Sequence, residues 1–198
     1  MKKINMGCGW RNFGKDWIHI DGGEYPHLDF KDITKLVFKD NEIGLIYSSH
    51  VIEYFDREEV IPVLKEWRRV LRPGGILRVA VPDFEAMAKL YVGGKFPLSN
   101  FLGPLYGKMK MGMKGPNEAN APTIYHKTVY DFQGLKEVLE TSGFRNVRRY
   151  DWKTTSPHDK FDDHSQSYLS SEGFKPTKTK RFDKEKGYLI SLNVEAEK

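Results

Sequence analysis

Short apolar segments alternate with polar turns through the first half of the chain. Each segment is rich in β-branched or aromatic residues and is bounded by Gly, Pro or Asp, a pattern typical of short strands. Apolar residues fill consecutive positions, so both faces of these strands are expected to be buried, as in a parallel sheet. The predicted strands are residues 3–6, 17–21, 28–32, 43–48 and 76–81.

A helix is predicted between the fourth and fifth of these strands. Apolar residues recur there at helical spacing, at Val60, Leu64, Trp67 and Val70. Asp56 and Glu59 are spaced as a capping box at its start, and the Pro-Gly-Gly of residues 73–75 ends it. Pro62 leaves two alternatives, because the helix either begins late with Pro62 in its first turn or is kinked there.

The second half of the chain predicts two more helices and two late strands. The helices are residues 83–91 and 130–142, the latter ending on Gly143 as a left-handed cap, and the strands are residues 147–152 and 188–195. Residues 93–125 are rich in Gly, Pro, Asn and Met, and residues 154–186 are polar and charged. Both stretches are expected to be loops or lids over the sheet edge.

Composition narrows the class of protein. A chain of 198 residues fits a single domain, residues 1–198, and a single cysteine excludes an internal disulfide. No Cys/His cluster has metal-ligand spacing, so no metal is expected, and no apolar run approaches the ~20 residues that span a bilayer. A cytoplasmic protein without a membrane span is therefore expected. The net charge of +5 permits an anionic partner, but nucleic acid is not favoured, since no basic face or reading module is evident.

The first predicted strand runs directly into the turn Gly7-Cys8-Gly9, and the second ends on Asp21. In an open α/β sheet the ligand lies outside the carboxyl ends of the strands, where glycines let backbone N–H groups approach and an acid accepts hydrogen bonds from a ribose. A dinucleotide fingerprint would need a third glycine at Asn12, and no Gly-Lys-Ser/Thr follows to make a Walker A loop. The pattern therefore predicts a nucleoside site other than NAD, FAD or a P-loop.

The order of these pieces resembles a known family. Residues 43–54 lead through the charged helix to Leu-Arg-Pro-Gly-Gly at 71–75 and then to the strand of residues 76–81. With the glycine turn, this order resembles short class I S-adenosylmethionine-dependent methyltransferases of the type 11 kind, most densely over residues 4–91. The resemblance implies an α/β, Rossmann-like methyltransferase fold with a mostly parallel seven-stranded sheet and an antiparallel last strand. Only about eight residues separate Gly9 from the second strand, so the first crossover helix, like the N-terminal helices, is expected to be reduced or missing.

The resemblance also implies S-adenosylmethionine as cofactor and a set of residues that bind it. Gly7 and Gly9 would give close backbone approach, with Cys8 as a small packing residue between them. Asp21 would bind the ribose hydroxyls, and the alternative for it is a turn that caps residues 22–23. Asp32 would meet the adenine amino group beside Ile33, and the alternative for Asp32 is again a turn cap.

The resemblance places the methyl-transfer side of the site after the fourth strand, at Ser48 and His50. His50 is the candidate general base, because imidazole titrates near neutrality, and the alternative is a histidine packed at a strand end. His126 is a second catalytic candidate beside the acceptor, whereas Glu53 is expected to pair with Arg68 or Arg69. The Lys/Met run of residues 108–114 is either an adaptable lid or a solvated loop.

The function that the resemblance implies is methyl transfer to an O or N acceptor on a small molecule or glycan. A catalytically silent scaffold subunit is the first alternative, because Gly44 replaces the acid usual before the fourth strand in the family and the crossover helix is short. A nucleic-acid methyltransferase is the second alternative, because the net positive charge would favour binding to a polyanion. The sequence leaves the acceptor and the oligomeric state open.

Overall fold

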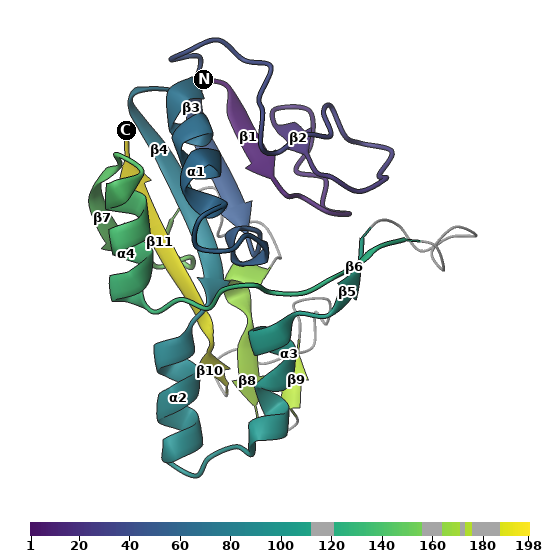
Figure 1. Cartoon of the computed structure of the whole chain (residues 1–198), viewed down its shortest axis with the longest axis vertical. Coiled ribbons are helices and arrows are strands. Elements are labelled where there is room, and N and C mark those ends of the chain that lie inside the picture. Colours follow the sequence, from purple (N-terminus) through teal and green to yellow (C-terminus); the bar gives the residue numbers. More distant parts are fainter. Residues whose placement is uncertain (112–120, 156–163, 171–172, 176–186) are drawn as a thin grey trace.

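The computed structural model describes residues 1–111, 121–155, 164–170, 173–175 and 187–198. Its centre is a six-stranded sheet in the order β2-β1-β3-β4-β11-β7 (Figure 1). The strands are β1 (Lys3–Met6), β2 (Ile18–Ile20), β3 (Ile43–Ser49), β4 (Leu71–Pro82), β7 (Arg145–Arg149) and β11 (Ser191–Glu197). The first four are mutually parallel, and β11 is antiparallel to both β4 and β7. The Rossmann-like α/β fold with an antiparallel last strand is therefore confirmed.

The third predicted strand, residues 28–32, is reduced to one bridge, in which Phe30 pairs with Ile20. The segment lies beside β2, as a third strand would, and the Asp29 N–H donates to the His19 carbonyl. However, the His19 N–H donates to the Asp29 carboxylate at 2.8 Å rather than to a backbone carbonyl. This side chain interrupts the ladder, so the prediction of seven strands is wrong by one, and the sheet has six with a bridge at its edge.

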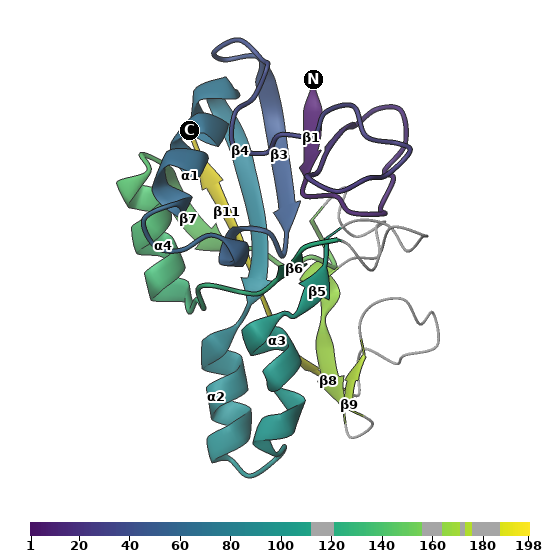
Figure 2. The ribbon, with the colours of Figure 1, turned by 45° about the vertical axis from the view of Figure 1, so that its right-hand side comes forward.

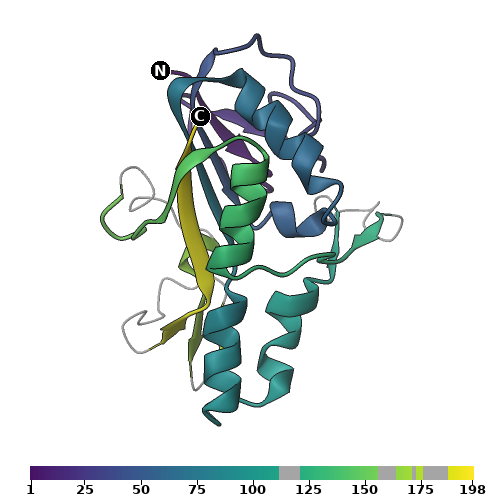
Figure 3. The ribbon, with the colours of Figure 1, turned by 60° about the vertical axis from the view of Figure 1, so that its left-hand side comes forward.

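Two helices, α1 (Val60–Val70) and α4 (Phe132–Thr141), cover one face of the sheet (Figure 3). They bury the main core, in which Trp67 and Leu135 are fully inaccessible. The Trp67 indole N–H donates to the Ile33 carbonyl at 2.7 Å and so fixes the segment after β2 on α1. Gly143 follows α4 with φ +93°, in agreement with the predicted cap.

The start of α1 resolves the alternatives left by Pro62. The Glu59 N–H donates to the Asp56 carboxylate at 2.8 Å, and the Asp56 N–H donates to the Glu59 carboxylate at 3.0 Å. This is the reciprocal pairing of a capping box. Since α1 begins at Val60, Pro62 lies in its first turn, where no partner for an N–H is needed.

The opposite face of the sheet has no helix between β1 and β2. Residues 7–17 form turns, and Trp17 packs with Leu45 and Tyr47 of β3 in a small second cluster. The missing first crossover helix is thus confirmed. Large aromatic side chains replace it, with Phe13 edge-on to Trp17 at a centroid distance of 5.4 Å.

The predicted helix of residues 83–91 is confirmed over residues 84–92, and regular structure also occurs in the described parts of the two stretches expected to be loops or lids. The helices α2 (Phe84–Val92) and α3 (Leu102–Tyr106) extend beyond the carboxyl ends of the parallel strands (Figure 2). The remaining short elements are η1 (Ile52–Tyr54), η2 (Leu98–Asn100), β5 (Met109–Lys110), β6 (Thr123–Ile124), η5 (His164–Gln166), β8 (Tyr168–Ser170), β9 (Gly173–Lys175) and β10 (Tyr188–Leu189). The predicted strand 188–195 is therefore divided between β10 and β11. Among the described residues, no helix combines the length and apolarity needed to cross a bilayer.

Candidate active site

A cavity of about 1100 Å³ opens where β1, β2 and β3 end. Its sheet-side wall comes from the loops after these strands, and the opposite wall comes from α3, β5 and β6. The predicted site residues that line it are Gly7, Gly9, Asp21, Ile33, His50 and His126. The structure therefore brings six residues from five separate segments to one hollow.

The glycine turn needs its glycines for conformation and for space. Gly7 has φ +64°, and a Cβ added there would lie 2.1 Å from Cγ2 of Val51. Gly9 has φ +56°, but a Cβ there would meet nothing closer than the Tyr25 hydroxyl at 3.9 Å. Gly7 thus permits close packing of the strand end on Val51, whereas Gly9 leaves open space on the cavity side.

The amide groups of this turn are already used within the protein. The N–H groups of Gly7 and Cys8 donate to the Ile20 carbonyl at 2.7 and 3.3 Å, and the Gly9 N–H donates to the Asp21 carboxylate at 2.8 Å. The expectation that these N–H groups face a ligand is therefore wrong. What the turn can offer a ligand is close backbone approach. Cys8 is buried, and burial together with nearby Asp21 raises the pKa of its thiol to about 12, which suits a packing residue rather than a nucleophile.

Asp21 combines the two roles considered for it. It lines the cavity, and its second carboxylate oxygen accepts from the Gly23 N–H at 2.7 Å, as the turn-cap alternative requires. Each carboxylate oxygen has further lone pairs, so the internal bonds leave acceptor capacity toward the cavity. Ile33 presents an apolar side chain in the same wall.

Besides the buried Cys8, two predicted residues do not line the cavity. Asp32 is exposed and caps the next turn, accepting from the Thr34 N–H and hydroxyl at 2.7 Å. These hydrogen bonds lower the pKa of its carboxyl. Ser48 is buried within β3, and its neighbour Ser49 lines the cavity instead. The turn-cap alternative therefore describes Asp32, and the strand register removes Ser48 from the site.

His50 follows β3 in a strained conformation. Its φ of +58° is unusual for a residue with a side chain, and the His50 N–H is held by the Ala80 carbonyl at 2.8 Å. Its Nε2 lies 3.3 Å from the Ser191 hydroxyl, and its ring is tilted by 42° against that of His164 at a centroid distance of 5.2 Å. Burial, followed by the neighbouring His164 and His126, holds the pKa of His50 well below its usual value. His50 is therefore a neutral imidazole near pH 7.

Glu53, which the sequence pairs with Arg68 or Arg69, lies instead beneath the two candidate histidines. Its side chain is fully buried, with Oε1 3.3 Å from Nδ1 of His50 and 3.8 Å from Nε2 of His126. Arg68 donates to the Gly143 carbonyl, and Arg69 pairs with Glu66 and Asp40. Burial raises the pKa of the Glu53 carboxyl to about 8. The only sequence signal for this contact is its position three residues after His50 in a turn.

His126 is fixed by α3 and by η1. Its Nδ1 lies 2.8 Å from the Pro104 carbonyl, and its ring meets that of Tyr54 edge-on at 4.7 Å. Burial lowers the pKa of His126. The two ring nitrogens of His126 thus face a backbone carbonyl and a buried carboxylate, so His126 is placed to organise the site. Nε2 of His50 faces the Ser191 hydroxyl, which can either donate or accept, and so it stays available to an acceptor.

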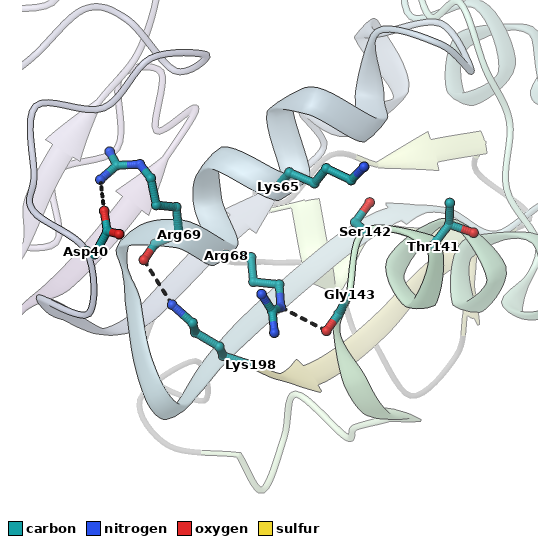
Figure 4. A pocket seen from close by; sticks show the side chains of 8 residues that line it. All are labelled: Asp40, Lys65, Arg68, Arg69, Thr141, Ser142, Gly143 and Lys198. Carbon is teal, nitrogen blue, oxygen red and sulfur yellow. Dashed lines mark hydrogen bonds and ion pairs between the residues drawn. The ribbon is translucent and has the colours of Figure 1, made fainter.

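A second hollow of about 400 Å³ lies where α1 and α4 end (Figure 4). Arg68 donates to the Gly143 carbonyl at 2.8 Å, and Lys198 donates to the Arg69 carbonyl at 3.0 Å. Cations at helix C-termini satisfy the last carbonyl groups and complement the helix dipole. We therefore assign this cluster a role in joining the helices.

Comparison with known proteins agrees with this geometry. Residues 19–79 match the family model described as a methyltransferase domain. A SAM-dependent methyltransferase from Methanosarcina mazei superposes with a TM-score of 0.55 at 16% identity, over 100% of this chain and 92% of that one. A SAM-dependent methyltransferase from Archaeoglobus fulgidus gives 0.53 at 15% identity, over 100% and 86%. The chain has the class I methyltransferase fold.

Another structure with this methyltransferase fold is a possible histamine N-methyltransferase from Thermotoga maritima, with a TM-score of 0.53 at 13% identity, over 100% of this chain and 82% of that one. A search of the curated proteins found no match. The family match and the fold support S-adenosylmethionine as the cofactor.

The cavity of this methyltransferase fold fits such a cofactor. A ribose needs a carboxylate acceptor, which Asp21 offers, and an adenine needs an apolar slot, to which Ile33 contributes. The open space at the missing side chain of Gly9 lets a ligand approach the backbone. Sequence reasoning missed much of the opposite wall, which includes Leu102, Pro104, Tyr106, Met109 and Tyr125. Those residues belong to segments without a motif, and only the Met-rich run hinted at them.

Proposed function

We propose that this chain is an S-adenosylmethionine-dependent methyltransferase that acts on an O or N acceptor of a small molecule or glycan. The observation that carries the proposal is the convergence of Gly7, Gly9, Asp21 and His50 on one cavity. We further propose that the chain works as one domain in the cytoplasm.

The size and lining of the cavity support a small acceptor. Ligand pockets usually hold about 300–1000 Å³, and this one measures about 1100 Å³, so cofactor and acceptor have room together. We assign the wall with Asp21 and Ile33 to the cofactor and the wall with Tyr54 and Tyr125 to the acceptor. Met109, whose sulfur lies 3.0 Å from the Tyr54 hydroxyl, is on the acceptor side, where its flexible side chain can adapt to different shapes.

Bound S-adenosylmethionine supplies an activated methyl group on a sulfonium centre. The contribution of the chain is to hold the acceptor against that group and to exclude water, and positioning of this kind can lower a barrier by several kcal/mol. His50 is placed to take the proton that a hydroxyl or amine loses on attack. Because its ring is neutral near pH 7, it is available as a base.

Calorimetric titration with S-adenosylhomocysteine tests the proposal. We expect micromolar affinity for the wild type and a loss on the order of 100-fold for Asp21→Ala, since a charged acceptor contributes roughly 1.5–3 kcal/mol per hydrogen bond. Asp32→Ala is the matched control, because Asp32 is an exposed carboxylate outside the cavity. Equal affinity in Asp21→Ala would remove Asp21 from the site, and thermal unfolding of each variant checks that the turn still folds.

A catalytically silent scaffold remains the alternative, and the absence of a helix in residues 7–17 favours it. That absence removes the helix N-terminus that commonly assists a ligand at a glycine loop. Wild-type protein that fails to bind S-adenosylhomocysteine at any accessible concentration would support the scaffold. Methylation of nucleic acid, suggested by the charge of +5, predicts a salt-sensitive gel shift with RNA or DNA, and its absence would count against that acceptor.

A further inference from the structure

The carboxylate of Glu53 is the most deeply buried charge-bearing group near the cavity. Both of its oxygens lack a hydrogen-bond partner among the described residues, although two histidine nitrogens lie close to Oε1. A buried carboxylate without a compensating proton or cation is costly. We therefore expect the Glu53 carboxylate to share a proton with those histidine nitrogens.

The tautomer of His126 strengthens this requirement. A backbone carbonyl can only accept, so Nδ1 of His126, 2.8 Å from the Pro104 oxygen, carries a hydrogen. In the neutral ring Nε2 is then a lone pair, and it faces Oε1 of Glu53 at 3.8 Å. A lone pair and a carboxylate repel each other, whereas one proton between them converts the contact into an attraction.

The other groups around the cluster do not replace that proton. The His164 ring lies 5.2 Å from that of His50, tilted by 42°, and Arg11 lies near enough to lower the pKa of His50 further. Burial, followed by the Glu53 charge, raises the pKa of the Tyr54 and Tyr130 phenols, so both remain neutral, and the Tyr54 hydroxyl lies 3.4 Å from the Gly107 carbonyl. The proton needed by Glu53 is therefore shared with the two histidines.

We propose that Glu53, His50 and His126 form one proton-sharing unit in which Glu53 is the positioning residue of His50. Glu53 directs the Nδ1–H of His50 toward itself and leaves Nε2 as the basic nitrogen. This inference rests on the proposed methyltransferase function, which gives His50 a proton to accept. The strained φ of +58° at His50 agrees with a ring whose direction is fixed by its surroundings.

The proton step balances as follows. The acceptor forms a bond from its oxygen or nitrogen to the methyl carbon, the carbon–sulfur electron pair stays on sulfur, and the acceptor proton passes to Nε2 of His50. The positive charge lost at the sulfonium thus reappears on His50. The proton shared within the unit then rests on Nε2 of His126, so that Glu53 faces the charged His50 ring as a carboxylate. A carboxylate behind an imidazole acts in this way in hydrolytic triads.

NMR of protein labelled with ¹³C in the glutamate carboxyls and with ¹⁵N in the histidine rings tests the unit directly. We expect one glutamate carboxyl to titrate near pH 8, and we expect the His50 and His126 ring signals to shift through the same midpoint. Above that midpoint His50 is expected as the Nδ1–H tautomer. The spectra of His50→Gln and His126→Gln assign the two rings.

Glu53→Gln is the decisive variant, and Glu58→Gln, an exposed glutamate on the same segment, is its control. The common step is expected to vanish only in Glu53→Gln, while affinity for S-adenosylhomocysteine stays within threefold. Independent histidine titrations, an Nε2–H tautomer of His50, or no glutamate titrating above pH 6 would overturn the inference. If Glu53→Gln does not fold, the wild-type carboxyl and tautomer signals decide alone. Failure of S-adenosylhomocysteine to bind the wild type would instead contradict the proposed function.

Discussion

Gly7→Ala is expected to lower the free energy of unfolding by roughly 2–5 kcal/mol. Two effects add at this position. An alanine at φ +64° is strained by about 1–2 kcal/mol, and its Cβ would overlap Cγ2 of Val51 at 2.1 Å. Denaturant unfolding of the variant measures the sum. Since Gly7 lines the cavity, affinity for S-adenosylhomocysteine is expected to fall with stability.

Gly9→Ala separates the two effects. It has a similar φ, +56°, but its Cβ would meet only the Tyr25 hydroxyl at 3.9 Å, so the expected loss is strain alone. Val51→Ala combined with Gly7→Ala removes the overlapping methyl groups and should recover part of the loss, although Cβ of Val51 still lies 3.2 Å from the added carbon. Equal losses for the two glycine variants, with no recovery in the double variant, would contradict the packing account.

Glu53→Gln is expected to raise stability relative to the wild type at pH 9 and to leave it nearly unchanged at pH 4. Burial raises the pKa of Glu53 to about 8, above the value of 4.5 that it has in the unfolded chain. Between these values the folded protein holds a proton that the unfolded chain lacks, so this group's contribution to stability is full below about pH 4.5 and is lost as pH rises through about 8. The loss is on the order of several kcal/mol.

The histidines act in the opposite direction at lower pH. Their pKa values are lowered by burial, so the folded state binds fewer protons than the unfolded chain and stability rises as pH approaches the ordinary histidine value of 6.5. Both proteins keep these histidines, so most of the histidine contribution cancels when the stability of Glu53→Gln is compared with that of the wild type. Thermal unfolding of both proteins at intervals between pH 4 and 9 measures the stability difference that is due to Glu53. A stability difference that does not change with pH would show that Glu53 stays ionised in the fold.

The sequence predicts the parts of this fold that depend on local pattern. The apolar runs at β1, β3 and β4 and the capping box at Asp56 and Glu59 are each complete within a few residues. The glycine turn and Asp21 can also be predicted from local pattern, because ligands in this class of sheet bind at the carboxyl ends of the strands, where both lie.

The remaining features depend on contacts between distant segments. Residues 28–32 have the composition of a strand, but the Asp29 side chain takes the His19 N–H that a ladder would need. The pairing of Glu53 with His126 arises because the chain returns over η1, where the Lys127 N–H donates to the Glu53 carbonyl at 2.8 Å. No spacing in the sequence indicates that residues 126–127 contact η1.

The central claim is that a nucleoside lies across Gly7, Gly9 and Asp21 with its reactive end toward His50. A crystal structure of the protein with S-adenosylhomocysteine tests this most directly, through the position of the ligand electron density. We predict that the ribose density lies against the Asp21 carboxylate and that the sulfur lies on the His50 side of the cavity. Density outside this cavity, or a nucleoside that does not contact Asp21, would contradict the account.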